Sequence, residues 1–117
     1  MKLEDFKVYH LSVDLGEKIY PLVMGWNYFD KDTIGKQLFR SADSIAANLS
    51  EGMGRYHYKE RKNFSYYSRG SLFETKTWLT KAYRRKLLKE ETFLDRTKDI
   101  ESIGIKLNNY IKTLKPQ

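Results

Sequence analysis

Cysteine is absent from the 117-residue chain, and histidine occurs only as His10 and His57. Without cysteine, disulfide frameworks, zinc fingers, iron–sulfur clusters and thiol nucleophiles are all excluded. Two isolated histidines do not supply the ligand cluster of a transition-metal site. We therefore expect no metal and no redox cofactor, in a chain whose length fits a single domain.

Long apolar runs are also missing. No segment approaches the ~18 consecutive apolar residues of a membrane-spanning helix, and the opening MKLEDFKVYH is charged. We expect neither a signal peptide nor a membrane anchor. The sequence therefore predicts a cytoplasmic protein without a membrane partner.

Proline is scarce, with only Pro21 and Pro116. Apolar residues recur at intervals of three and four positions along almost the whole chain, which is the period of an amphipathic helix. This pattern predicts an all-α fold with helices at about residues 4–28, 31–53, 58–86 and 91–114. Short connections between four similar helices favour a single antiparallel, up-down-up-down four-helix bundle over residues 1–117.

The expected helix ends have local causes. Asp30 and Asp32 can cap the second helix by accepting hydrogen bonds from its free backbone N–H groups, and Gly52 and Gly54 can end it. The basic run 84–86 suits the negative C-terminal end of the third helix. Pro21 falls on a polar strip of the first helix, which predicts a kinked but continuous helix.

The first predicted helix is apolar on two sides. One seam suits the bundle core and contains Val8, Leu11, Leu15, Ile19, Leu22 and Trp26. A second seam, roughly 140° around the helix axis, contains Phe6, Tyr9, Val13 and Tyr20. A helix that is apolar over so much of its circumference needs a second partner, which predicts self-association. The alternative is that this helix lies deeper in its own bundle.

The fourth predicted helix has a single apolar stripe, made of Phe93, Ile100, Ile103, Leu107, Tyr110, Ile111 and Leu114. The opposite side is polar. We therefore expect this helix to pack through one face only.

The second predicted helix carries the segment RSADSIAANLSEG, residues 40–52. Its apolar stripe is Ile34, Leu38, Ala42, Ile45 and Leu49, and its polar stripe is Arg40, Ser44, Asn48 and Glu51. We interpret the polar stripe as a structural network that fixes helix register, with Glu74 as a partner across the helix interface. A catalytic alternative would use Glu51 as acid or base and Arg40 as an anion holder. No histidine, cysteine or paired carboxylate accompanies them, so we do not expect an enzyme.

Positive charge is concentrated in the third predicted helix. The chain has a net charge of +7, and residues 57–91 contain ten basic and four acidic side chains. The face expected to meet the core is Phe64, Tyr67, Ser71, Trp78 and Ala82, flanked by Leu72 and Leu79. On the far side we expect a basic stripe of Lys59, Lys62, Arg69 and Lys76, with Tyr66 and Phe73 between the cations.

Cations interleaved with aromatic rings are typical of nucleic-acid-binding surfaces, because the cations neutralise phosphates and the rings stack on bases. Two other interpretations stay open: a solvated outer helix face, and a subunit contact through Tyr66 and Phe73. A membrane-surface helix is disfavoured, because the bundle needs the apolar face.

Several ordered motifs resemble a known family. They are FKVYHLSVDL with IYPL between residues 6 and 22, RSADSIAANLSEG at 40–52, GR at 54–55, KE at 59–60 and RGSLFETKTWL at 69–79. Over about residues 5–83 the chain resembles the four-helix-bundle proteins of the 23S rRNA intervening-sequence (S23) family. The resemblance implies a bacterial protein related in fold to accessory proteins of diversity-generating retroelements. It also implies a ring-shaped homo-pentamer with a basic surface and a non-enzymatic association with RNA or nucleoprotein.

Two positions depart from the family pattern. His57 stands where the family commonly has the serine of a capping box, so the third helix lacks that hydroxyl acceptor at its start. Arg85 and Lys86 replace the family's Leu-Gly stop.

From the basic stripe, the second seam and the resemblance together, we expect a non-enzymatic, self-associating bundle that binds RNA or DNA through its third helix. We expect it to need no cofactor or small-molecule substrate. A protein–protein adaptor without direct nucleic-acid contact is the alternative.

Overall fold

Four long helices account for most of the chain in the computed structural model, which describes residues 1–116. They are α1 (Lys7–Met24), α3 (Lys36–Met53), α4 (Tyr58–Arg84) and α5 (Glu90–Thr113). A 3₁₀ turn, η1 (Leu3–Asp5), precedes α1. The short α2 (Tyr28–Asp30) and a π-helical turn, η2 (Lys31–Gly35), lead without a break into α3.

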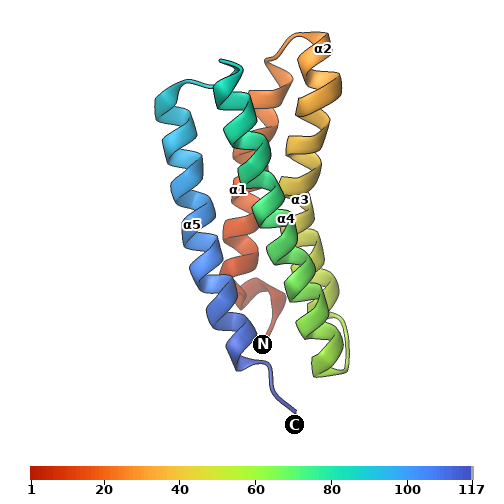
Figure 1. The fold of residues 1–117 in the computed structure, drawn as a ribbon. Helices are drawn as coiled ribbons and strands as arrows, with labels where there is room; N and C mark the ends of the chain where they lie inside the picture. Colours follow the sequence, from red (N-terminus) through yellow and green to blue (C-terminus); the bar gives the residue numbers. More distant parts are fainter. Residues whose placement is uncertain (117) are drawn as a thin grey trace.

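The four helices form an elongated bundle that measures 49 × 23 × 22 Å. The chain runs along α1, returns along α3, runs forward again in α4 and returns in α5, so that both termini lie at the same end (Figure 1). Helix α1 packs beside α3 and α5, and α4 packs beside the same two helices. The all-α prediction is confirmed. None of the helices in the described part of the chain is both long and apolar enough to cross a membrane.

The junction between the first two long helices differs from the expectation. Helix α1 ends at Met24, and Asn27 caps the next helical segment by accepting a 3.0 Å hydrogen bond from the backbone N–H of Asp30. Asp30 and Asp32 were wrongly assigned as caps: Asp30 accepts a bond from the Asn27 side chain, and Asp32 pairs with Lys36 at 2.6 Å. An amide at position 27 satisfies the helix start three residues earlier, which moves the boundary.

Pro21 lies inside α1 and is exposed, so the prediction of a continuous helix is confirmed. Its missing N–H falls on the solvated side, where water can bind the unpaired carbonyl.

Helix α4 ends in a complete Schellman motif although no glycine is present. The backbone N–H of Leu87 donates to the carbonyl of Ala82 at 2.9 Å, and that of Lys86 donates to Tyr83 at 2.9 Å. This geometry requires a left-handed residue, and Lys86 supplies it with a φ of 63°. The replacement of Leu-Gly by Arg85 and Lys86 therefore leaves a standard helix stop in place.

The core runs along the centre of the bundle. Its fully buried members include Leu15, Ile19, Leu38, Ile45, Leu79, Ile103 and Leu107. The predicted stripe of the fourth helix is confirmed, since all seven of its residues are buried or half-buried. The predicted stripe of the second helix is confirmed as well.

Helix α4 buries a face rotated from the one expected: Leu72, Leu79 and Ala82 are buried as predicted, but the rest of the predicted face is not. Its buried residues are Ser65, Ser68, Leu72, Thr75, Leu79 and Ala82. Tyr67, assigned to the core, is 57% exposed, while Phe64, Ser71 and Trp78 are only half-buried. The hydroxyls can be buried because each finds an acceptor: Ser65 donates to the carbonyl of Arg61 and Ser68 to that of Ile45. Thr75 donates to the carbonyl of Ser71 at 2.7 Å, and its oxygen lies 3.0 Å from the Ser41 hydroxyl.

Small residues bring α3 and α4 close together. A Cβ built on Gly52 would lie 2.9 Å from Cβ of Phe64 and 3.4 Å from the carbonyl oxygen of Arg61. Gly52 therefore serves helix contact, and Gly54 ends α3 with a φ of −79°. The expectation that the helix ends at these glycines is confirmed for Gly54, which does so with right-handed geometry, while Gly52 lies inside α3.

Candidate functional site

The basic stripe of α4 lies on the side of the helix that turns toward α5. Arg69 donates to the side-chain oxygen of Asn108 on α5 at 3.0 Å, which fixes this orientation. Lys59 and Lys76 are exposed, and Lys62 and Arg69 are half-buried. Arg69 therefore places this part of the stripe beside α5, and not diametrically opposite the core as expected.

Both aromatic residues of the stripe reach solvent. The Tyr66 side chain is 40% exposed and Phe73 is 65% exposed. The Arg69 guanidinium lies over the Tyr66 ring, 4.8 Å from its centroid. This contact occupies one face of the tyrosine and leaves Phe73 as the freer of the two rings.

The cations of the stripe have no anionic partner in the described part of the chain. The ion pairs among residues 1–116 involve Lys18, Lys36, Arg55 and Arg96, and none involves the four stripe residues. A row of uncompensated cations produces a positive potential that attracts polyanions.

An open hollow adjoins the stripe on α4. It has a volume of about 380 Å³ and is lined by Phe73, Lys76, Thr77, Thr80, Lys81 and Arg84. Lys81 was not predicted to lie on this surface, and Arg84 was predicted only to suit the helix end. Lys81 and Arg84 lie four and seven residues after Thr77, which places them on the same side of the helix. This spacing could have assigned both to the surface from the sequence.

Exposed aliphatic residues on α5 were also missed. Ile105 is 65% exposed and Leu94 is 48% exposed. Ile105 lies three residues before Asn108, so it falls on the side of α5 that borders the stripe. The α4–α5 surface therefore combines cations with both aromatic and aliphatic groups.

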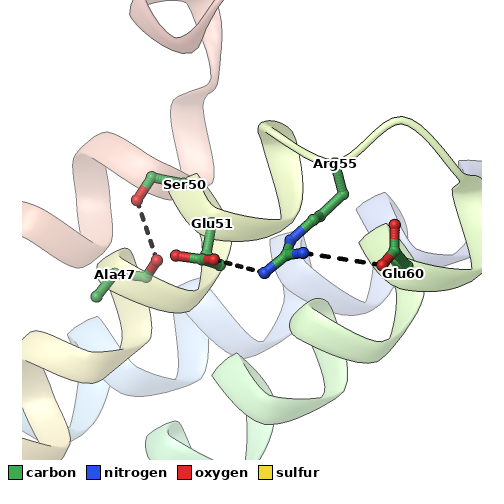
Figure 2. A network of polar contacts seen from close by, with 5 residues as sticks. All are labelled: Ala47, Ser50, Glu51, Arg55 and Glu60. Carbon is green, nitrogen blue, oxygen red and sulfur yellow. Dashed lines mark hydrogen bonds and ion pairs between the residues drawn. The ribbon is translucent and has the colours of Figure 1, made fainter.

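The predicted polar network of the second helix does not form within the bundle. Glu51 is exposed and pairs with Arg55 at 2.7 Å, and Arg55 also approaches Glu60 at 3.8 Å (Figure 2). Ser44 donates to the backbone carbonyl of Arg40, one turn earlier. The hydroxyl is satisfied locally, so it has no need of a partner on another helix.

Glu74 likewise bonds within its own helix, accepting from the indole N–H of Trp78 at 3.0 Å. No bond of the Asn48 side chain occurs among residues 1–116. The catalytic alternative required Glu51 beside Arg40, yet Glu51 contacts Arg55 at the helix end. The geometry therefore does not pair Glu51 with Arg40.

The second seam of α1 is divided between core and surface. Phe6 is only 3% exposed and its ring packs 4.6 Å from that of Tyr110. Its assignment to an oligomer seam was wrong, because α5 covers it within the same chain. Tyr9 and Val13 are half-buried, and Tyr20 is 54% exposed.

Asp43 of α3 lies directly over α1. A Cβ on Gly16 would be 2.4 Å from its Oδ1 atom, so a side chain at position 16 would displace the Asp43 carboxylate. Partial burial, together with the neighbouring Glu17, raises the pKa of the Asp43 carboxyl above its usual value. Elsewhere, burial raises the pKa of the Tyr110 phenol.

The start of α4 agrees with the expectation for His57. This residue is the N-cap and its side chain makes no capping bond. Arg61 donates to the carbonyl of Arg55 at 2.7 Å, which ties the preceding turn to the helix. No cluster of three metal-ligating side chains occurs within residues 1–116.

Comparison with known proteins adds three findings. The fold matches a crystal structure of a protein of unknown function from the S23 ribosomal protein family of Bacteroides thetaiotaomicron VPI-5482, with a TM-score of 0.85 and 24% identity over 94% of this chain and 99% of that one. No curated protein matches. The family model of the 23S rRNA-intervening sequence protein matches residues 4–109. The chain therefore belongs to the 23S rRNA-intervening sequence protein family.

Proposed function

We propose that this protein is a non-enzymatic, self-associating bundle of the cytoplasm that binds nucleic acid, as RNA or nucleoprotein, through the basic stripe of α4. The observation that carries the proposal is the row of four cations without carboxylate partners, next to two exposed rings. The family name, which refers to an intervening sequence of ribosomal RNA, is consistent with an RNA partner.

The chemistry of the stripe suits a phosphodiester chain. Each phosphate neutralised by lysine or arginine releases condensed counterions, so binding is strong at low salt and weakens steeply as salt rises. The Phe73 ring offers a flat apolar face on which an unpaired base can stack. Self-association would repeat the stripe in every subunit and multiply the number of phosphate contacts.

The direct test is a salt-titrated binding assay with structured RNA and duplex DNA. We expect log affinity for the duplex to fall with log salt by roughly 0.9 per phosphate contact. Reversal of the stripe in Lys62→Glu/Arg69→Glu/Lys76→Glu should abolish binding while circular dichroism and melting show a folded bundle, because the core lies on another face.

The matched control is Lys2→Glu/Lys112→Glu/Lys115→Glu. These three exposed lysines lie near the chain ends, away from the stripe. Because three cations are reversed in each case, this variant has the same net charge as the stripe reversal. We expect it to keep most of the parent's affinity. A stripe reversal that is folded and binds as well as the parent would remove the proposed surface.

A second candidate function is a protein–protein contact through the same surface. The observation in its favour is the exposure of Ile105 and Leu94, because aliphatic side chains neither stack on bases nor bind phosphate. Tyr66→Ala and Phe73→Ala separate the two candidates. On a nucleic-acid surface each should weaken single-stranded binding by about 1 to 3 kcal/mol. If they dissociate the oligomer instead, the surface is a subunit or adaptor contact.

A further inference from the structure

Five cations crowd the end of the bundle where α4 passes into α5. Residues 81–89 contain Lys81, Arg84, Arg85, Lys86 and Lys89 and no acidic residue, and Glu90 and Glu91 follow them in the first turn of α5. All five side chains are exposed, and none joins an ion pair within residues 1–116. This end lies opposite the two chain termini, so neither terminus covers it (Figure 1).

The backbone that carries these cations is held in place. The Schellman bonds of Lys86 and Leu87 fix the turn after α4. The indole N–H of Trp26 donates to the carbonyl of Leu87 at 3.1 Å and ties this turn to the α1–α2 connection. The charges therefore sit on a defined loop and not on a loose tail, which lowers the entropy lost on binding.

Helix electrostatics explain only part of this cluster. Cations favour the C-terminal end of a helix, which accounts for Arg84 and Arg85. Lys89, however, is the N-cap of α5, where a cation opposes the helix dipole and no side-chain bond caps the helix. Lys86 occupies a left-handed conformation in which glycine costs less. Both lysines work against the stability of the local fold, as is common for residues held for binding.

Two open hollows join this cluster to the basic stripe. The hollow lined by Phe73, Lys76, Lys81 and Arg84 meets, at Arg84, a second one of about 540 Å³. The second hollow is lined by Tyr83, Arg84, Lys86, Leu87, Leu88 and Lys89. A path with cations along its length thus leads from an exposed ring on the side of α4 over the end of the bundle.

We propose that this α4–α5 end is a second phosphate-contact site, beyond the basic stripe, for a single-stranded nucleic acid, which continues from there along α4 to Phe73. A single strand fits better than a duplex, because only unpaired bases can place a face on Phe73 while their phosphates follow the cations. The inference rests on the proposed function and assigns to it a site that the basic stripe does not contain.

The test compares two reversals of equal charge with fluorescence anisotropy on 20-nucleotide oligo(U) and oligo(dT). The end variant is Arg84→Glu/Arg85→Glu/Lys89→Glu, and the control is Lys2→Glu/Lys112→Glu/Lys115→Glu. All six residues are exposed, so both variants should fold. We expect the end variant to lose about tenfold or more in affinity at low salt and its salt slope to shrink by roughly 2, given about 0.7 per contact on single strands.

Each outcome decides the inference. Equal losses in the end variant and the control would overturn it, since the effect would then come from net charge alone. Parent-like binding by the end variant, with loss in the stripe reversal, would overturn it and leave the proposed function standing. Loss of affinity in the end variant but not in the stripe reversal supports the inference, and it moves the proposed nucleic-acid surface from the stripe to the α4–α5 end. A parent that binds phosphatidylserine vesicles and neither oligonucleotide overturns both.

Discussion

Lys86 is, among residues 1–116, the one residue other than glycine with a positive φ. A side chain in the left-handed region costs about 1 kcal/mol relative to glycine, because Cβ crowds the backbone. We therefore expect Lys86→Gly to raise the free energy of unfolding by about 1 kcal/mol, as measured by urea denaturation.

Arg85→Gly is the control for this change. It removes the same charge one position earlier, where φ is −85° and glycine brings no relief. We expect it to be neutral or slightly destabilising. Equal effects of the two variants would mean that charge, and not backbone strain, governs the stability of this turn.

Asp43 should make stability depend on pH. Because its pKa is raised in the folded protein, the folded state binds the proton more tightly than the unfolded state does. The protonated Asp43 carboxyl therefore stabilises the fold relative to the ionised one. This stabilisation is lost as pH rises through the folded pKa and regained as pH falls toward the ordinary pKa of aspartate. Asp43→Asn should be more stable than the parent at pH 7, and thermal melts should show this gain disappearing below about pH 4. Glu101→Gln, on the exposed side of α5, serves as the control.

At the scale of the elements, the contact between α3 and α4 depends on the lack of a side chain at position 52. Gly52→Ala would place a methyl 2.9 Å from Cβ of Phe64, so the helices must separate. We expect a loss of about 1 to 3 kcal/mol in unfolding free energy, which is typical of overpacking.

Gly70 provides the opposite case on the neighbouring helix. A Cβ at Gly70 would meet nothing within 4 Å. Gly70→Ala should therefore stabilise α4 by up to about 1 kcal/mol through helix propensity alone. Destabilisation by this substitution would show that position 70 is covered in solution, as in an assembly.

At the scale of the whole molecule, an apolar surface remains on α1 after the bundle has formed. Tyr20 and Met24 are 54% and 47% exposed, next to the half-buried Val13. We expect the protein to be an oligomer, five-fold as the family resemblance implies, and Tyr20→Glu/Met24→Glu to dissociate it. Light scattering at micromolar concentration measures the mass.

The folded state of that variant should survive, because neither side chain belongs to the buried core. Circular dichroism checks this point. A parent that sediments cleanly at 13.9 kDa would rule out self-association.

The sequence by itself determined the helices and most of their inner faces. The stripe of α5 and that of α3 could be predicted because a helical period depends only on residues three and four apart. The basic and aromatic residues of α4 could also be found from the sequence, because their charge and ring character are read from residue type and their common face from the helical period. The departure at His57 was also local, and the missing cap followed from it.

Tertiary structure decided what each helix face meets. Ser68 of α4 became core because α3 supplies an acceptor for its hydroxyl, and Thr75 because its hydroxyl bonds one turn back within α4 and meets Ser41 of α3. Sequence periodicity counts such residues as polar. Phe6 entered the core because α5 places Tyr110 beside it. The polar residues of α3 formed no network because bonds within one turn satisfied them first. Burial depends on neighbours that are distant in sequence, and no local pattern encodes their positions.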